Sequence, residues 1–275
     1  TETFSASPDA ILRAHLRSNG WFAQQNIQEP NLAELLDLVA LGSVADVVPL
    51  DANNRILVHQ GLARIRAGRA RPGLQAILNV ARRDHRSLVS TDLGFIVGPR
   101  LNAAGRLDDI SLGIECLLCE DADGALWRAQ QLEQLNQDRK HIEQSMQREA
   151  LVQLKDLPLD NLPFGLCLFE PEWHQGVIGI LASRMKERYH RPVIAFADAG
   201  EGLLKGSARS IPGLHIRDTL DAVAARFPEL ISKFGGHAMA AGLSLQAIHY
   251  EAFAKAFDAE VRRQLTADDL TWRIY

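Results

Sequence analysis

The stretch FGLCLFEPEWHQGVIGILASRMKERYHRPVIAF, residues 164–196, decides the fold class of the chain. Its two short apolar runs, 164–169 and 193–196, have the length and composition of strands, and residues 177–189 between them have the periodicity of a helix. The alternation continues with an expected strand at 203–210, a helix at 215–226, a segment near a strand at 239–245 and a helix at 250–265. Strands that alternate with helices are typical of an α/β fold, which we expect for this half of the chain.

The first half of the chain has a different pattern, which predicts mainly helices. Helical periodicity occurs at 8–18, 31–40, 53–66 and 73–81, with Asn31 as an expected N-cap. A polar stretch without proline then predicts one long helix, whose thin apolar stripe is typical of a connector between domains. We therefore expect a largely helical part at residues 1–120, a connector helix at 121–155 and an α/β domain at 156–275.

The composition is that of a soluble globular protein. The 275 residues are 47% hydrophobic and 23% charged, and no apolar run reaches the roughly 18 residues that a membrane-spanning helix needs. Three cysteines are too few for a disulfide framework, and the N-terminus lacks the pattern of a signal peptide, so we expect a cytoplasmic protein without membrane contact. The chain does not begin with Met, which indicates processing or a start inside a longer protein.

Positive charge is concentrated in one segment. Residues 51–110 contain ten Arg and five Asp but no Lys or Glu, whereas the whole chain has a net charge of −4. Guanidinium groups bind phosphate through paired hydrogen bonds, so this segment fits a phosphate-rich partner. A solvated helical surface explains the same charge equally simply.

Two motifs of the first half could carry chemistry. Asp46 stands among apolar residues, where a buried carboxylate would need a partner, and as a hard oxygen ligand it suits Mg²⁺ or Mn²⁺; a helix cap or an ion pair is the alternative. The small-residue segment 98–106 carries Arg100, Asn102 and Arg106, and as a loop it would let phosphate approach both main-chain N–H groups and guanidinium groups. A helix-packing loop with surface arginines is the alternative.

Three motifs of the second half are candidate phosphate sites. His174 precedes an expected helix N-terminus, and strand alternation places Ser207 and Arg209 on one face, with Ser210 next to them. Two glycines before a histidine allow a ligand to approach the backbone closely. These glycines and the histidine are Gly235, Gly236 and His237. Ordinary capping, an exposed strand face and a tight turn are the respective alternatives, while the Cys116-x-x-Cys119 pair is expected to pack in the core rather than bind zinc.

Five of these motifs, in this order and at these intervals, resemble the RecJ family of single-strand-specific DNA exonucleases in the DHH phosphoesterase superfamily. The motifs are LGSVADVVPL at 41–50, GPRLNAAGR at 98–106, WHQGVIGI at 173–180, KGSARS at 205–210 and FGGH at 234–237. The resemblance extends from about residue 20 to 265. It implies the C-terminal part of a DHH domain, a long helix and an α/β DHHA1 domain.

The resemblance also implies an activity. Proteins of this family degrade single-stranded DNA from the 5′ end with two Mn²⁺ or Mg²⁺ ions, in DNA repair and recombination. It implies that Asp46 is a metal ligand, that Arg100 and Arg106 approach the scissile phosphate, and that the remaining candidates hold DNA phosphates. We further expect a monomer that works with a single-strand-binding protein and a helicase.

The Asp-His-His motif of the family is missing from the chain, as are its other acidic ligands and its oligonucleotide-binding fold. We expect the Asp-His-His motif and the other acidic ligands to precede residue 1 and the isolated chain to be inactive. Two alternatives remain open: a DHH-family phosphodiesterase for short oligonucleotides or cyclic dinucleotides, and a non-catalytic DHHA1 module that binds nucleic acid.

Overall fold

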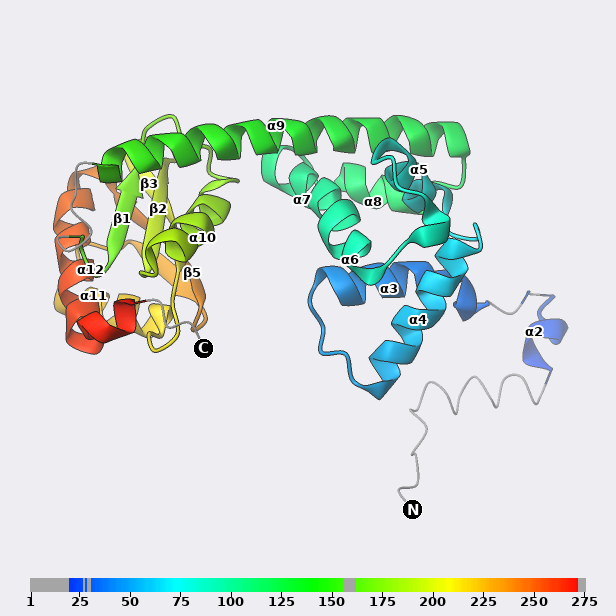
Figure 1. Cartoon of the computed structure of the whole chain (residues 1–275), viewed down its shortest axis with the longest axis horizontal. Coiled ribbons are helices and arrows are strands. Elements are labelled where there is room, and N and C mark those ends of the chain that lie inside the picture. The colour runs from blue at the N-terminus through cyan, green and yellow to red at the C-terminus, as the bar shows by residue number, and fades with distance from the viewer. Residues whose placement is uncertain (1–19, 27, 29–30, 156–161, 272–275) are drawn as a thin grey trace, which may run out of the picture. The chain divides into compact units, whose positions relative to one another are not determined.

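The computed structural model describes residues 20–26, 28, 31–155 and 162–271, so the helix predicted at 8–18 lies outside the described residues. The chain divides into two compact units (Figure 1). The first contains the described residues up to Ala70 together with Asp84–Phe95, and the second contains Arg71–Arg83 and the residues from Ile96 onward. None of the described helices is long and apolar enough to cross a membrane.

The first unit is helical. Its elements are α2 (Trp21–Gln24), η1 (Leu32–Leu35), α3 (Leu36–Ala45), α4 (Ala52–Arg66), η2 (His85–Ser87) and α6 (Ser90–Asp92). The predicted cap is present, since Asn31 Oδ1 accepts a hydrogen bond from the Ala33 N–H at 3.2 Å. Gly61 allows α4 to pack directly on α3, because a Cβ there would lie 2.2 Å from the Leu36 carbonyl oxygen. The helices expected near 31–40 and 53–66 are confirmed.

The second unit begins with the helices α5 (Pro72–Val80), α7 (Gly98–Leu107) and α8 (Ser111–Leu118), which pack on the long helix α9 (Ala122–Lys155). The π-helix η3 (Leu93–Val97) leads from the first unit into α7. The long helix predicted over 121–155 is α9, and α5, α7 and α8 lie along its N-terminal half (Figure 1). The loop expected over 98–106 is wrong, because this segment forms α7. Proline at the start of α7 favours a helix, and the small residues Ala103 and Ala104 are buried against its neighbours.

The rest of the second unit is the α/β domain that the sequence predicts. Its sheet has the order β1-β2-β3-β5-β4, in which β1 and β2 are parallel and the other pairs antiparallel. The strands are β1 (Leu166–Phe169), β2 (Val193–Asp198), β3 (Leu203–Arg209), β4 (Lys233–Gly236) and β5 (Ala240–Gln246). The helices are α10 (Ile178–Tyr189), α11 (Ile216–Arg226) and α12 (Tyr250–Gln264), with short turns η5 (Ala247–His249) and η6 (Ala267–Leu270). The sequence did not predict β4, which is short and contains two glycines.

Two hydrophobic clusters lie on opposite faces of the sheet. Ile194 and Phe196 of β2 pack with α11 and α12, whereas Val193, Ala195 and Ala197 pack with α9 and α10. On the second face, α10 packs against β2 and β3. The corresponding face of β5 and β4 carries the exposed or half-buried residues of their alternating burial patterns. Other elements therefore cover both faces of the sheet at β2, whereas one face is open at β5 and β4.

Candidate functional site

A cavity of about 600 Å³ lies on this open face, and its lining comes from three places in the second unit. Strands β3, β5 and β4 form the floor, the N-terminal end of α10 forms one side, and the C-terminal end of α7 completes it. Four of the lining residues are cationic: Arg106, Lys205, Arg209 and Lys233. The lining contains no Asp or Glu. A water-accessible concavity with this charge attracts anions.

Strand register aligns the polar residues of the floor. Ser207 of β3 lies opposite Gly242 of β5, which lies opposite Gly235 of β4. A second row lies two residues away: Lys205 of β3 is opposite Ser244 of β5, which is opposite Lys233 of β4. Residues two apart on a strand share a face, so both rows point into the cavity. The predicted placement of Ser207 and Arg209 on one face is confirmed, and Arg209 Nη1 donates to Ser207 Oγ at 3.1 Å.

The floor glycines Gly235 and Gly242 have no structural reason to be glycine. A Cβ at Gly235 would meet nothing within 4 Å, and a Cβ at Gly242 would meet only the Gly206 carbonyl oxygen at 3.9 Å. Gly206 differs, because a Cβ there would lie 2.6 Å from the Phe196 ring. Glycine inside an element costs roughly 0.5–1 kcal/mol relative to alanine. Where packing does not demand it, glycine in a strand marks a place where a ligand approaches the backbone closely.

The sides of the cavity are joined by a close backbone contact. A Cβ at Gly176 would lie 2.0 Å from the Arg106 carbonyl oxygen, so only glycine allows α7 to approach the turn before α10. Arg106 Nη1 donates to the Gly176 carbonyl oxygen at 3.3 Å. Gly179, in the first turn of α10, faces Arg209 and Ser207, since a Cβ there would lie 3.0 Å from Arg209 Nη2. Arg106, Ser207 and Arg209 are thereby brought together around one end of α10.

Burial and neighbouring charges lower the pKa values of the two guanidinium groups of the cavity. Burial lowers the pKa of Arg209 below its ordinary value, and the charge of Arg106 lowers it further. Burial also lowers the pKa of Arg106; the charge of Arg139 adds to this effect and that of Glu143 opposes it. Arginine nevertheless keeps its proton in proteins. Two like charges are therefore held near each other and partly out of water, an arrangement that a bound anion would relieve.

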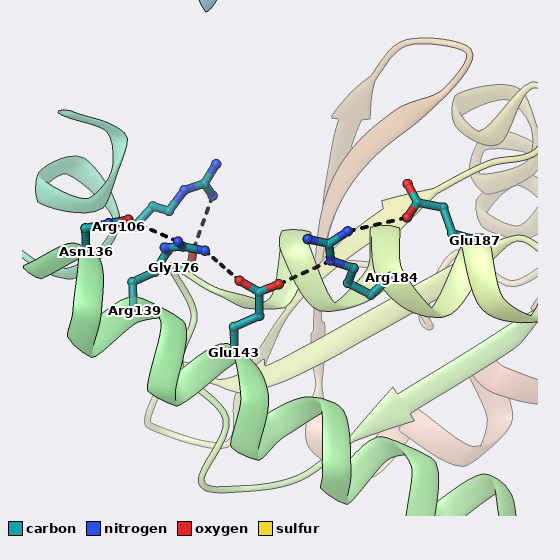
Figure 2. A network of polar contacts seen from close by, with 7 residues as sticks. All are labelled: Arg106, Asn136, Arg139, Glu143, Gly176, Arg184 and Glu187. Carbon is teal, nitrogen blue, oxygen red and sulfur yellow. Dashed lines mark hydrogen bonds and ion pairs between the residues drawn. The ribbon is translucent and has the colours of Figure 1, made fainter. Parts of the chain in front are cut away.

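An ion-pair network holds the side of the cavity onto α9 (Figure 2). Glu143 of α9 pairs with Arg139 on the same helix, with Arg139 Nη1 2.5 Å from Glu143 Oε2. Its other oxygen, Oε1, lies 3.2 Å from Nε of Arg184 on α10, and Arg184 also pairs with Glu187 at 3.7 Å. Arg139 Nη2 donates to Asn136 Oδ1 at 3.1 Å. The network fixes the position of α10 relative to the long helix.

Comparisons with known proteins agree on one family. Residues 163–263 match the DHHA1 domain family. The single-stranded-DNA-specific exonuclease RecJ of Dickeya dadantii is 60% identical over 261 residues, which are 94% of this chain and 45% of that protein. The protein of the same name from Escherichia coli is 61% identical over 248 residues, or 90% of this chain and 43% of that protein. The chain thus spans less than half the length of these curated relatives.

The solved structures that match the chain are RecJ structures as well. The crystal structure of RecJ in complex with Mg²⁺ from Thermus thermophilus has a TM-score of 0.74 and 33% identity, covering 88% of this chain and 36% of that one. A crystal structure of exonuclease RecJ bound to manganese has a TM-score of 0.71 and 32% identity, covering 90% of this chain and 61% of that one. The chain corresponds to a segment of RecJ. The resemblance read from the five sequence motifs is confirmed.

The structure separates the two arginines of the segment 98–106. Arg106 lines the cavity, whereas Arg100 is buried against α9, where its Nε donates to Glu133 Oε2 and its Nη1 donates to the Ile96 carbonyl oxygen at 2.6 Å. Asn102 is exposed and does not line the cavity. The structure therefore gives Arg100 a packing role and leaves Arg106 as the arginine of α7 that is available to a ligand.

Of the predicted phosphate-binding residues on β4 and in the turn after it, only one lines the cavity. Gly235 lines the cavity, but Gly236 does not; it has a φ of 150° at the end of β4, where a Cβ would lie 2.5 Å from the Ala240 carbonyl oxygen. His237 follows in the β4–β5 turn, where it is exposed and its N–H donates to the Ala240 carbonyl oxygen at 2.8 Å. The structure thus matches the tight-turn alternative at Gly236 and His237 and places neither in the cavity.

His174 and Ser210 have local structural partners. His174 is exposed outside the cavity, and its Nδ1 accepts a hydrogen bond from the Gly176 N–H at 3.1 Å. Ser210 is buried, and its Oγ donates to the Leu214 carbonyl oxygen at 2.8 Å. Ser210 therefore donates to its own loop and does not line the cavity, and its role at a phosphate stays a prediction. Cys116 packs in the core, as expected, and burial raises the pKa of its thiol to about 11.

Asp46 is not buried among apolar residues. It follows the last residue of α3, at a point where Val47 adopts a φ of 55° and is 85% exposed. Asp46 is itself exposed, so the argument from a buried carboxylate does not hold. Among the described residues, no group of three or more His, Cys, Asp or Glu side chains could hold a metal ion. The described part of the chain therefore does not fit a divalent-metal site by itself.

The sequence did not identify Lys205, Lys233, Gly242 and Ser244 as site residues. Lys205 lies two residues before Ser207, so the alternation that paired Ser207 with Arg209 also places Lys205 on the same face. Lys233, Gly242 and Ser244 join the site only through the pairing of β4 and β5 with β3. That pairing could be predicted only after β4 had been recognised as a strand.

Proposed function

We propose that the chain carries the part of a single-strand-specific 5′-to-3′ DNA exonuclease that holds the phosphates at the 5′ end of the strand. The observation that carries this proposal is the cavity with four cationic side chains and no carboxylate. The names of the relatives support the substrate, since they are called single-stranded-DNA-specific exonucleases. DNA repair and recombination are the processes that we infer for the whole protein.

The residues of the cavity suit a terminal phosphate. Arg106 and Arg209 offer guanidinium N–H groups to phosphate oxygens, and charge-assisted hydrogen bonds of this kind are among the stronger ones in proteins. Ser207 adds a hydroxyl, and the first turn of α10 adds the positive end of a helix. A phosphate monoester carries about −1.5 to −2 charges at neutral pH, whereas a diester inside the strand carries one. The cavity should therefore favour the 5′-phosphorylated end.

Binding to labelled oligonucleotides tests the proposal. The chain should bind a 5′-phosphorylated single strand at least about tenfold more tightly than the same strand with a 5′-hydroxyl, as expected for charged hydrogen bonds. Arg209→Ala should remove most of this difference, while Arg188→Ala, at an exposed position on α10 outside the cavity, should leave it intact. Fluorescence anisotropy measures both. Equal affinity of the unaltered chain for the two ends would contradict the proposal.

Turnover is expected to need more than this chain. The structures of relatives are complexes with Mg²⁺ or Mn²⁺, and we propose Asp46 as one ligand of such an ion. Because the described residues provide no group of ligands around it, the chain alone should bind Mn²⁺ weakly and release no nucleotides. Mn²⁺-dependent release of mononucleotides from 5′-labelled single strands by the purified chain would overturn this expectation. A single-strand-binding protein, a helicase, a monomeric state and a cytoplasmic location stay predictions.

A further inference from the structure

Arg139 of α9 is a largely buried arginine whose polar contacts stay within one helix. Its Nη1 lies 2.5 Å from Glu143 Oε2 and its Nη2 donates to Asn136 Oδ1 at 3.1 Å, so both partners are on α9. The side chains of Arg139 and Glu143 are only 11% and 12% exposed. A buried ion pair is weak evidence for stability, and arginine before glutamate is the less favourable order on a helix. Among the described residues, Arg139 therefore makes no polar contact that joins two elements of the fold.

Glu143, in contrast, makes a contact that the fold uses. Its Oε1 lies 3.2 Å from Nε of Arg184, so this carboxylate ties α9 to α10 (Figure 2). The N-terminal end of α10 forms one side of the cationic cavity. The packing of α10 therefore requires a negative charge near a site that is suited to anions.

Arg106 is the cation of the cavity on which this negative charge acts. It forms no ion pair with a carboxylate in the described part of the chain. Burial lowers the pKa of Arg106, the charge of Arg139 lowers it further and the charge of Glu143 raises it, so both members of the pair act on Arg106. Figure 2 shows three arginines and two glutamates in this cluster, namely Arg106, Arg139, Arg184, Glu143 and Glu187. One positive charge of the cluster is thus left over for an anion.

Removal of Arg139 would change the partner of Glu143. Oε2 of this carboxylate would lose its cation, and a largely buried charge without a partner is strongly unfavourable. Arg106 is the guanidinium of the same cluster that has no carboxylate of its own, so it would take the place of Arg139. Its guanidinium would then turn away from the cavity. Two arginines and two glutamates would remain, with no positive charge left over.

We propose that Arg139 is a positioning residue for the cavity: by occupying Glu143, it keeps the guanidinium of Arg106 free for the phosphate. Arg139 does not line the cavity and acts only through its two neighbours. Glu143 holds α10, Arg139 neutralises Glu143, and Arg106 meets the ligand. This inference rests on the proposed function of the cavity as a phosphate site.

Loss and rescue of binding test this role. In the full chain, Arg139→Met should lower the preference for a 5′-phosphorylated strand over a 5′-hydroxyl strand by about fivefold, as expected when a charged hydrogen bond is lost. Arg139→Met/Glu143→Gln should restore most of the preference, because Arg106 then has no acid to pair with. Arg139→Lys should retain most of it, since it keeps the charge. Fluorescence anisotropy with labelled strands measures each ratio.

A purely structural role predicts the opposite order of effects. Glu143→Gln breaks the contact between α9 and α10, whereas Arg139→Met breaks no polar contact between elements. The positioning role predicts that Glu143→Gln keeps the preference; its loss in this variant and in the double variant would overturn the inference. A second measurement does not depend on Glu143. In an Arg106→Ala background Arg139→Met should have no further effect, and an additional loss there would also overturn the inference.

Controls separate this inference from the proposed function. Arg262→Met removes the same charge from an arginine that pairs with Asp258 on α12, outside the cavity, and should leave the preference unchanged. An equal loss in Arg262→Met would mean that net charge alone is responsible and would contradict the positioning role. If the preference depends on Arg106 but not on Arg139, the inference is wrong and the proposed function stands. If the unaltered chain shows no preference, the proposed function fails and the inference with it. Thermal melting of each variant confirms that it is folded.

Discussion

Two arginines of one helix have opposite surroundings. Arg100 and Arg106 are six residues apart on α7, so their side chains project in directions about 120° apart around the helix axis. One guanidinium is buried against Glu133 of α9, and the other reaches the cavity. The sequence shows both as arginines beside small residues and does not distinguish them. Only the helical geometry decides which of them can meet a ligand.

This division leads to a prediction at the residue scale. Arg100→Ala should destabilise the chain by about 3 kcal/mol, because it leaves Glu133 partly buried without its cation. Urea unfolding measures the loss. At a temperature where the variant is folded, its affinity for 5′-phosphorylated DNA should match that of the unaltered chain. A stable Arg100→Ala variant with weakened binding would reverse the roles of the two arginines.

The serines show how far strand periodicity alone can go. Alternation correctly placed Ser207 with Arg209, because residues two apart on a strand share a face. Ser210 follows the last residue of β3, and its hydroxyl is used by the loop that leads to α11. The candidates His174, Gly236 and His237 were drawn from motifs without a strand or helix register. Their hydrogen bonds and backbone angles serve local turns, which sequence patterns do not reveal.

At the scale of elements, the glycines of the sheet have two different functions. Gly206→Ala should destabilise the chain by about 1–3 kcal/mol, because the added methyl group meets Phe196 and Leu243 in the core. Gly242→Ala should leave stability unchanged or raise it by up to about 1 kcal/mol, since its methyl group meets only the Gly206 carbonyl oxygen at 3.9 Å and the unfolded chain loses the conformational freedom of glycine. The free energy of unfolding of each variant checks this pair.

The same pair distinguishes folding from ligand binding. Gly242→Ala should weaken binding of a 5′-phosphorylated single strand although the variant is stable, because the methyl group projects into the cavity. Unchanged affinity of Gly242→Ala for this strand would show that the ligand does not approach the sheet at this position. The sequence indicated one of these glycines, Gly235, through its proximity to a histidine. Gly242 became visible only through its pairing with Ser207.

At the scale of the molecule, charge is organised by the fold rather than by the sequence. The ten arginines of residues 51–110 divide equally between the two compact units. The cavity draws its cations instead from positions 106 to 233, in a chain whose net charge is −4. Of the ten arginines in the segment, only Arg106 lines the cavity, and a phosphate-rich partner for the rest of the segment stays a prediction.

Because the cationic side chains that attract DNA are confined to one cavity of a chain with net negative charge, the affinity for single-stranded DNA should depend only modestly on salt concentration. If the cavity holds one phosphate, the logarithm of the affinity for a single strand should fall with the logarithm of the salt concentration with a slope of about −0.7. Arg209→Ala should make this slope shallower. Titrations between low and moderate salt measure it. A slope several times steeper in the unaltered chain would place most phosphate contacts outside the cavity.

The long helix α9 also constrains how the chain can evolve. Its Glu133 pairs with α7 and its Glu143 pairs with α10, while Arg106 of α7 contacts Gly176 just before α10 at 3.3 Å. One inserted residue between these glutamates would rotate the second half of α9 by about 100°, and seven would nearly restore the rotation but add about 10 Å. Neither change keeps all three contacts. Among homologues, the residues between Glu133 and Glu143 that make none of these contacts, apart from Arg139, should therefore tolerate substitution, whereas insertions and deletions in this segment should be rare.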